Sequence, residues 1–129
     1  MDNTNTRPAV AAITDAEIED GKMMAILAYI IFLIPLLAAK DKKFAMFHTE
    51  QALVLLIAWV VLIIAFNIIA IIVSATNVHF ITCGIWLISL LVYLAGAVLW
   101  ILGIINAATG KLKELPFLGQ YGAKFNLVK

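Results

Sequence analysis

The sequence predicts an all-α, polytopic integral membrane protein with three transmembrane helices and interfacial segments. Its 129 residues are 64% hydrophobic and 13% charged, whereas soluble domains average about 45–50% apolar and about 25% charged residues. No Asp, Glu, Lys or Arg occurs between Lys22 and Lys40, or between Glu50 and Lys111. A soluble fold of this size has too much surface to leave such stretches uncharged. These observations exclude a soluble enzyme, a disordered chain and a basic nucleic-acid binder.

The N-terminal part, residues 1–22, is expected to be a polar, acidic tail that leads into the first span. Thr14 and the glutamate three residues later have the spacing of a capping box, which predicts the start of a short helix. Residues 23–39 would reach about 26 Å as a helix, which is enough for a short span. Pro35 is expected to kink or end this helix near Leu33, because proline lacks a backbone donor and clashes with the preceding turn.

The long uncharged block after Glu50 is expected to form a hairpin of two spans. As a single helix it would measure about 90 Å, three times the bilayer core of roughly 30 Å. Its turn-forming residues gather at 74–84, and the block contains neither Gly nor Pro before that point. The sequence therefore predicts spans at about 51–75 and 83–108, a membrane domain over 23–110, and an interfacial C-terminal tail over 111–129.

The positions of Lys and Arg predict the orientation of the chain. With three spans, the loop at 40–50 and the C-terminal tail share a side that carries seven lysines, whereas the other side has only Arg7 and Lys22. Cytoplasmic flanks of membrane spans are enriched in these residues. We therefore expect a multi-pass protein of the bacterial inner membrane, or of a compartment derived from it, with a cytoplasmic C-terminus and the acidic tail outside.

Small and polar residues inside the spans are candidates for helix association. Ser89, Gly96 and Gly103 recur at heptad spacing, and Gly110 continues the series. In lipid, small residues let helix backbones approach closely, so this stripe is predicted to pack against a neighbouring helix. Asn67 lies well inside the second span, where its amide is expected to hydrogen-bond to another helix of the same chain or of a second copy.

The polar residues at the start of the second span form a second candidate site. His48 and Gln51 lie three residues apart beside Phe47. They are either interfacial residues or an anchor between helices or to a ligand, and two such side chains are too few for a metal site. His79 and Cys83 near the outer loop also lack further ligands, so neither a metal nor a cofactor is expected.

An acidic cluster in the N-terminal tail is a weak candidate for cation binding. Its carboxylates could recruit hard cations through oxygen ligands, although acids at a helix start are more often solvated and favoured by the helix dipole. The chain contains no converging set of nucleophile, acid and base, and no charge inside a predicted span. This disfavours an enzyme and a self-contained pump. The four acids are Asp15, Glu17, Glu19 and Asp20.

Several stretches together resemble a known family of membrane proteins. They are residues 24–29, 34–37, 43–53, 102–111 and 115–119. The resemblance is to the Tic-twenty-like family of small bacterial three-span membrane proteins. That family is distantly linked to a channel-forming subunit of the chloroplast inner-envelope protein importer, and it includes the magnetosome membrane proteins MamF and MmsF.

The resemblance implies motif residues but no catalytic residue. This chain departs from the usual Gln-Gly pair of the family by having Ala52, which keeps a small residue at that position. The motif residues lie at the two ends of the uncharged block, on the expected cytoplasmic side. They are Phe47, His48, Gln51, Gly110, Pro116 and Gly119.

Three functions remain open on the sequence alone. The leading one is a non-enzymatic membrane protein that acts through helix–helix association, as a homo-oligomer or as a subunit of an assembly. The second is an oligomeric translocation or transport component, and the third is a membrane protein of a mineral- or cation-handling compartment like the magnetosome. The expected partners are the lipid bilayer and either further copies of the chain or other membrane proteins, and not nucleic acid.

Overall fold

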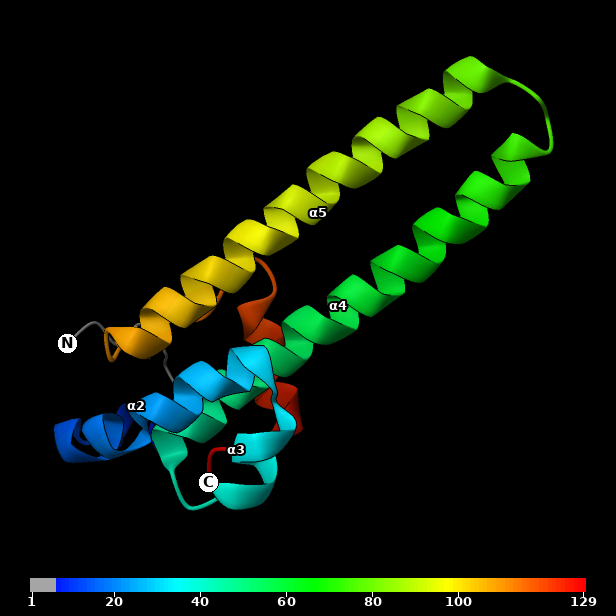
Figure 1. Ribbon diagram of the computed structural model, residues 1–129. Coiled ribbons are helices and arrows are strands. Elements are labelled where there is room, and N and C mark those ends of the chain that lie inside the picture. Colours follow the sequence, from blue (N-terminus) through cyan, green and yellow to red (C-terminus); the bar gives the residue numbers. More distant parts are fainter. Residues whose placement is uncertain (1–6) are drawn as a thin grey trace.

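The computed structural model describes residues 7–129, which are largely helical and contain no strand (Figure 1). Residues 1–6 of the expected acidic tail, Asp2 among them, lie outside the described part of the chain. The elements are α1 (Pro8–Ala11), α2 (Asp15–Ile30), α3 (Leu33–Ala38), α4 (Lys43–Ser74), α5 (His79–Ala108) and the 3₁₀ helix η1 (Gly119–Phe125).

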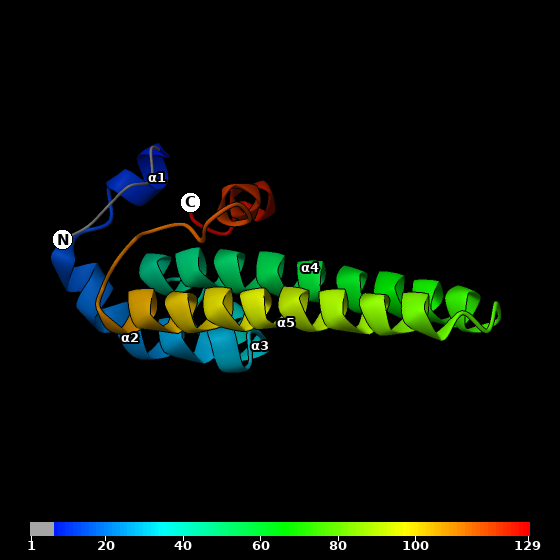
Figure 2. The same ribbon diagram turned by 90° about the horizontal axis from the view of Figure 1, so that it is seen from above.

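The two longest helices, α4 and α5, lie side by side as a hairpin (Figures 1 and 2). Among residues 7–129, only these two helices are long and apolar enough to cross a bilayer. At 1.5 Å per residue they measure about 48 Å and about 45 Å. The chain reverses between Ser74 and His79, where Asn77 has a left-handed backbone φ of 59°. The predicted pair of long apolar helices is confirmed, with a tighter turn than the expected one at 74–84.

The expected first span over residues 23–39 is not one continuous helix, and the interruption that Pro35 predicted near Leu33 is present at Ile31. Helix α2 ends at Ile30, and Ile31 is extended, with φ −138° and ψ 94°. Proline explains the break: Pro35 has no N–H to donate to the carbonyl of Ile31, and its ring would clash with that carbonyl if the helix continued. The chain then turns back through the short helix α3 (Figure 1). The predicted count of three spans is therefore not supported.

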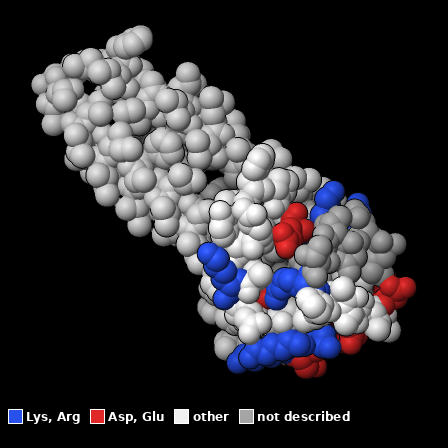
Figure 3. Space-filling model, turned by 180° about the vertical axis from the view of Figure 1, so that it is seen from behind, with Lys and Arg blue, Asp and Glu red and all other residues white. Residues whose placement is uncertain are grey.

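The segments that flank the long hairpin meet at one end of the molecule, which we call the polar end (residues 7–22, 39–51 and 109–129). Lys42 forms an ion pair with Asp20 across the base of the α2–α3 hairpin, with Nζ and Oδ2 2.5 Å apart. Charged side chains gather at this end (Figure 3). The acidic tail therefore lies beside the 40–50 loop, whereas the sequence predicted that the two lie on opposite sides of the membrane.

The start of α4 is the core of the polar end. The hairpin of α2 and α3 packs on one side of it, and α1 and the C-terminal segment pack on the other (Figure 2). Every residue from Phe44 to Ala52 is consequently buried. Beyond Leu55 the same helix is mostly exposed and apolar, as at Val61 and Ile72. The first part of α4 is thus buried within the chain, whereas the exposed apolar part beyond Leu55 needs a partner protein or lipid to cover it.

Candidate functional site

The first turns of α4 contain four fully buried polar side chains. Thr49 bonds to the carbonyl of Ala45 in its own helix, whereas the other three, His48, Glu50 and Gln51, reach other segments, and we call these three the polar clamp. Each is at most 1% exposed. A polar group in such surroundings must find hydrogen-bond partners, since burying it unpaired costs about 1–3 kcal/mol by protein mutational data. Positions 48 and 51 lie three residues apart on one face of the helix, and position 50 points away from them. His48 and Gln51 therefore both reach the chain that follows α5, whereas Glu50 reaches the N-terminal and C-terminal segments.

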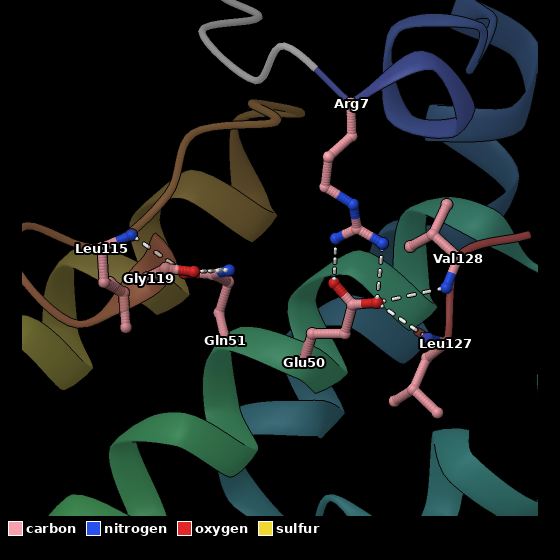
Figure 4. Close-up of polar contacts among 7 residues, drawn as sticks. All are labelled: Arg7, Glu50, Gln51, Leu115, Gly119, Leu127 and Val128. Carbon is pink, nitrogen blue, oxygen red and sulfur yellow. Dashed lines mark hydrogen bonds and ion pairs between the residues drawn. The ribbon is translucent and has the colours of Figure 1, made fainter. Parts of the chain in front are cut away.

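Glu50 binds both the N-terminal and the C-terminal segments (Figure 4). Arg7 donates two hydrogen bonds to its carboxylate, one of them from Nη2 to Oε1 at 3.1 Å. The backbone N–H groups of Leu127 and Val128 donate to the same Oε1, at 2.8 and 3.2 Å. The hydrogen bond to Glu50 raises the pKa of the Arg7 guanidinium above its ordinary value. The buried charge is therefore compensated by one cation and two amides.

Gln51 holds the chain segment that follows α5 (Figure 4). Its Nε2 donates to the carbonyl of Gly119 at 3.0 Å, and its Oε1 accepts from the backbone N–H of Leu115 at 3.0 Å. The approach is close enough to require glycine. A Cβ at Gly119 would lie 2.4 Å from Oε1, and one at Gly122 would lie 2.8 Å from Nε2. The amide and the two glycines thus fit together as one contact.

His48 links α2 to the chain just after α5. Its Nε2 lies 2.9 Å from the carbonyl oxygen of Lys111, which can only accept, so Nε2 carries a proton and donates. The other ring nitrogen, Nδ1, lies 2.8 Å from the hydroxyl of Tyr29, and in the neutral tautomer it accepts from that hydroxyl. The rings of Phe44 and Phe47 meet the imidazole edge-on, with centroids 4.8 and 5.2 Å away.

The structure brings most of the motif residues to this one place. Phe47, His48 and Gln51 lie on adjacent turns of α4, and Gly119 contacts Gln51 directly. Gly110, with a φ of 75°, ends α5, where the N–H of the next residue bonds back to the carbonyl of Asn106 at 2.8 Å. That pattern is a Schellman motif, which favours glycine. Pro116 is exposed in the connecting segment.

The small residues of α5 lie buried and face large aromatic side chains. A Cβ at Gly96 would lie 1.9 Å from Nε1 of Trp59 on α4, and one at Gly103 would lie 2.3 Å from the Tyr29 ring on α2. Ser89 is also buried, and its hydroxyl donates to the carbonyl of Trp86 in its own helix. The stripe therefore meets two different helices.

The remaining candidates are not brought into a common site. Asn67 is exposed and donates to the carbonyl of Ile63 in its own helix at 2.7 Å. Within residues 7–129 it makes no hydrogen bond to another helix. His79 and Cys83 are exposed at the end of the hairpin that is remote from the polar end.

The acidic cluster is largely engaged in contacts within the chain. Glu17 and Thr14 form the expected capping box. Glu19 pairs with Lys22, in addition to the pair of Asp20 with Lys42 already described. In the described part of the chain, no three His, Cys, Asp or Glu side chains converge in a way that could hold a metal ion.

Sequence reasoning missed three residues that the site depends on: Glu50, Arg7 and Tyr29. A signal for two of them was present, because Glu50 is the last charge before the long uncharged block and Arg7 is the single arginine of the chain. A carboxylate at the start of an apolar helix needs a partner, and arginine is the residue best suited to a buried ion pair. Nothing in the local pattern marks Tyr29.

Together, fold and site define an all-helical membrane protein in which two long apolar helices emerge from a folded polar end. Residues 20–121 match the model of one family, and the chain belongs to this magnetosome magnetite crystal formation protein family. It is 32% identical over 110 residues to the UPF0132 membrane protein MJ1527 of Methanocaldococcus jannaschii, an alignment that covers 82% of this chain and 70% of the relative. No solved structure matches the chain significantly. The expected relation to MamF and MmsF is thus confirmed, and the Tic-twenty-like relation stays a prediction.

Proposed function

We propose that the chain is a non-enzymatic membrane protein of a mineral-forming compartment, anchored by two spans and displaying its polar end on the cytoplasmic side. The observation that carries this proposal is the clamp at the start of α4. It ties the segments before α2 and after α5 to one end of the molecule through Glu50 and Gln51. A chain tied in this way enters and leaves the membrane on the same side.

The dimensions of the helices support two spans and a re-entrant hairpin. The exposed part of α4, from Leu56 to Ser74, is about 28 Å long and fits the hydrocarbon core of roughly 30 Å. The apolar part of α2, from Met23 to Ile30, is only about 12 Å long. The hairpin of α2 and α3 would therefore dip into one leaflet and return, and the carbonyl of Tyr29 next to its break is hydrogen-bonded by Trp100 of α5, as backbone groups in a membrane require.

The distribution of basic residues supports a cytoplasmic polar end. All nine Lys and Arg residues of the chain lie in or beside the polar end, and the turn between α4 and α5 has none. The positive-inside rule then favours the cytoplasm for this end. The C-terminus would be cytoplasmic, and the segment before α2 would be cytoplasmic with it.

This orientation changes what the acidic cluster would do in a mineral-forming compartment. Glu19 and Asp20 would face the cytoplasm rather than the lumen, and both already pair with lysines. We therefore propose that the chain acts through the membrane and through protein association, not by binding cations with these acids. The exposed apolar faces of α4 and α5 beyond the polar end are the surfaces on which further copies or other membrane proteins would pack.

Complementation in a magnetosome-forming cell that lacks its own family member tests the proposal. The chain is expected to restore crystal size, measured by electron microscopy. A variant with Asp15→Asn and Glu19→Gln, both at exposed positions, is expected to restore it equally. Failure of the unaltered chain, when inserted at normal levels, would exclude the mineral function. Failure of the acid variant alone would favour direct cation binding instead.

A further inference from the structure

The break between α2 and α3 leaves a cavity of about 300 Å³ against α4 and α5. Its walls come from the end of α2, from α4 and from one tryptophan of α5. They include Ala28, Ile30, Ala52, Leu56, Trp59 and Trp100. The cavity exists because the chain turns back at Ile31 instead of continuing along α4 and α5, so the space that a longer α2 would fill stays open.

The polar side-chain groups of this cavity are paired within the chain, with one exception, Nε1 of Trp59. The hydroxyl of Tyr29 bonds to His48, and the carbonyl of Tyr29 accepts from Nε1 of Trp100 at 2.7 Å. Nε1 of Trp59 has no acceptor within residues 7–129, and it lies against Gly96. A buried water needs two to four polar partners, and one donor does not supply them. The cavity is therefore suited to an apolar occupant.

The opening of the cavity is continuous with the exposed apolar surface of α4 and α5, which would contact lipid in the proposed topology. Ile30, Leu56 and Trp100 at its rim are 60%, 41% and 41% exposed. Leu56 also begins the exposed apolar face of α4. A flexible chain from the surrounding bilayer can enter here without crossing any polar group, and it gains dispersion contacts that an unfilled void lacks.

We propose that this cavity holds one acyl chain of a bilayer phospholipid. The occupant follows from three properties of the cavity: apolar walls, polar side-chain groups that are paired within the chain except for Nε1 of Trp59, and an opening onto the exposed apolar surface of α4 and α5. The bound chain would complete the packing of the re-entrant hairpin against α4. The inference rests on the proposed topology, which sets the depth of the α2–α3 break in the membrane.

Photo-crosslinking from the lipid tests the proposal with the full chain. The protein is reconstituted in phosphatidylcholine vesicles that contain a phosphatidylcholine with a diazirine in the middle of one acyl chain, and adducts are mapped by mass spectrometry. Adducts are expected to concentrate on the cavity residues of α2 and α4. Leu56→Trp, which blocks the rim, should lower this labelling by more than half. Val60→Trp, one turn further on an equally exposed face, should leave it unchanged.

A second variant and a separate readout keep the test decisive. Ala28→Leu fills the cavity from its inner wall and should lower the same labelling if Leu56→Trp does not fold. Even labelling of all exposed faces, labelling unchanged by both variants, or crosslinks joining two chains at the cavity would each overturn the proposal. Cysteine labelling from the two sides of the membrane reports the topology independently, so failure of the topology and failure of lipid binding can be told apart.

Discussion

At the scale of single residues, Glu50 is the side chain that joins the two ends of the described chain. Its carboxylate is fully buried and receives hydrogen bonds from Arg7 and from the backbone of Leu127 and Val128. A buried ion pair is not by itself a large source of stability, but removing one partner is costly, because the other partner and the amides are left unpaired. Glu50 therefore determines whether the N-terminal and C-terminal segments stay docked.

Glu50→Gln is expected to lower the free energy of unfolding by about 1.5–3 kcal/mol, the range for hydrogen bonds to charged groups. The neutral amide can no longer accept both bonds from Arg7. Glu19→Gln is the matched control, because the pair of Glu19 with Lys22 is exposed, and less than about 1 kcal/mol is expected there. Thermal unfolding in detergent compares the two, and equal shifts would contradict the role given to Glu50.

The sequence predicted the clamp only in part. Helical spacing and the resemblance singled out His48 and Gln51, because both lie at the start of an apolar helix. Their partners were beyond sequence reasoning, since Gly119 is separated from Gln51 by two long helices. Tyr29 was missed for a related reason: an aromatic residue in an apolar segment carries no sign that its hydroxyl will meet an imidazole.

At the scale of elements, α5 packs against both α2 and α4 through its small residues. Gly96 lies against the indole of Trp59, and Gly103 lies against the ring of Tyr29. The heptad spacing predicted a packing stripe, but not that two different helices would share it. Pro35 predicted a kink or an end of the helix near Leu33, but the sequence does not show that the chain turns back there. That reversal keeps α2 beside only the part of α5 that is next to the polar end.

Gly96→Ala is expected to destabilise the protein by about 1–3 kcal/mol, the usual cost of overpacking. Its new Cβ would overlap with Trp59, and neither helix can move without disturbing the hairpin. Gly84→Ala on the same helix meets no atom within 4 Å. Because glycine weakens a helix interior, this control should stabilise the protein by about 0.5–1 kcal/mol. Chemical unfolding followed by circular dichroism measures both, and the same sign for both variants would refute the packing role.

Trp100→Phe is expected to make the backbone at the end of α2, where the helix breaks, more mobile. The indole N–H of Trp100 donates to the carbonyl of Tyr29, and a carbonyl left unpaired away from water costs about 1–3 kcal/mol. The control is Trp86→Phe, because that side chain is 67% exposed and should tolerate the change. Hydrogen exchange of the amides in α2 should rise in the first variant only. If hydrogen exchange were unchanged in both variants, the hydrogen bond from Trp100 to Tyr29 would not stabilise the end of α2.

At the scale of the whole molecule, the chain has one polar end and one apolar end. Composition alone identified a membrane protein, because the long uncharged block leaves no soluble alternative. The span count failed at 23–39, where length and hydropathy satisfied the rule for a span while proline broke the helix. Because α2 and α3 form a hairpin, the Asp20–Lys42 pair joins the two ends of that segment. Every Lys and Arg residue then lies at the polar end of the molecule.

The re-entrant hairpin requires the segments before α2 and after α5 to lie on the same side of the membrane. In a Cys83→Ser background, Ala12→Cys and Lys113→Cys are labelled with a membrane-impermeant maleimide in right-side-out and inside-out vesicles, with Thr76→Cys in the turn as the control. Positions 12 and 113 are expected to react from the same side, the cytoplasmic one, and position 76 is expected to react from the other. Labelling of positions 12 and 113 from opposite sides would restore three spans and contradict the re-entrant hairpin.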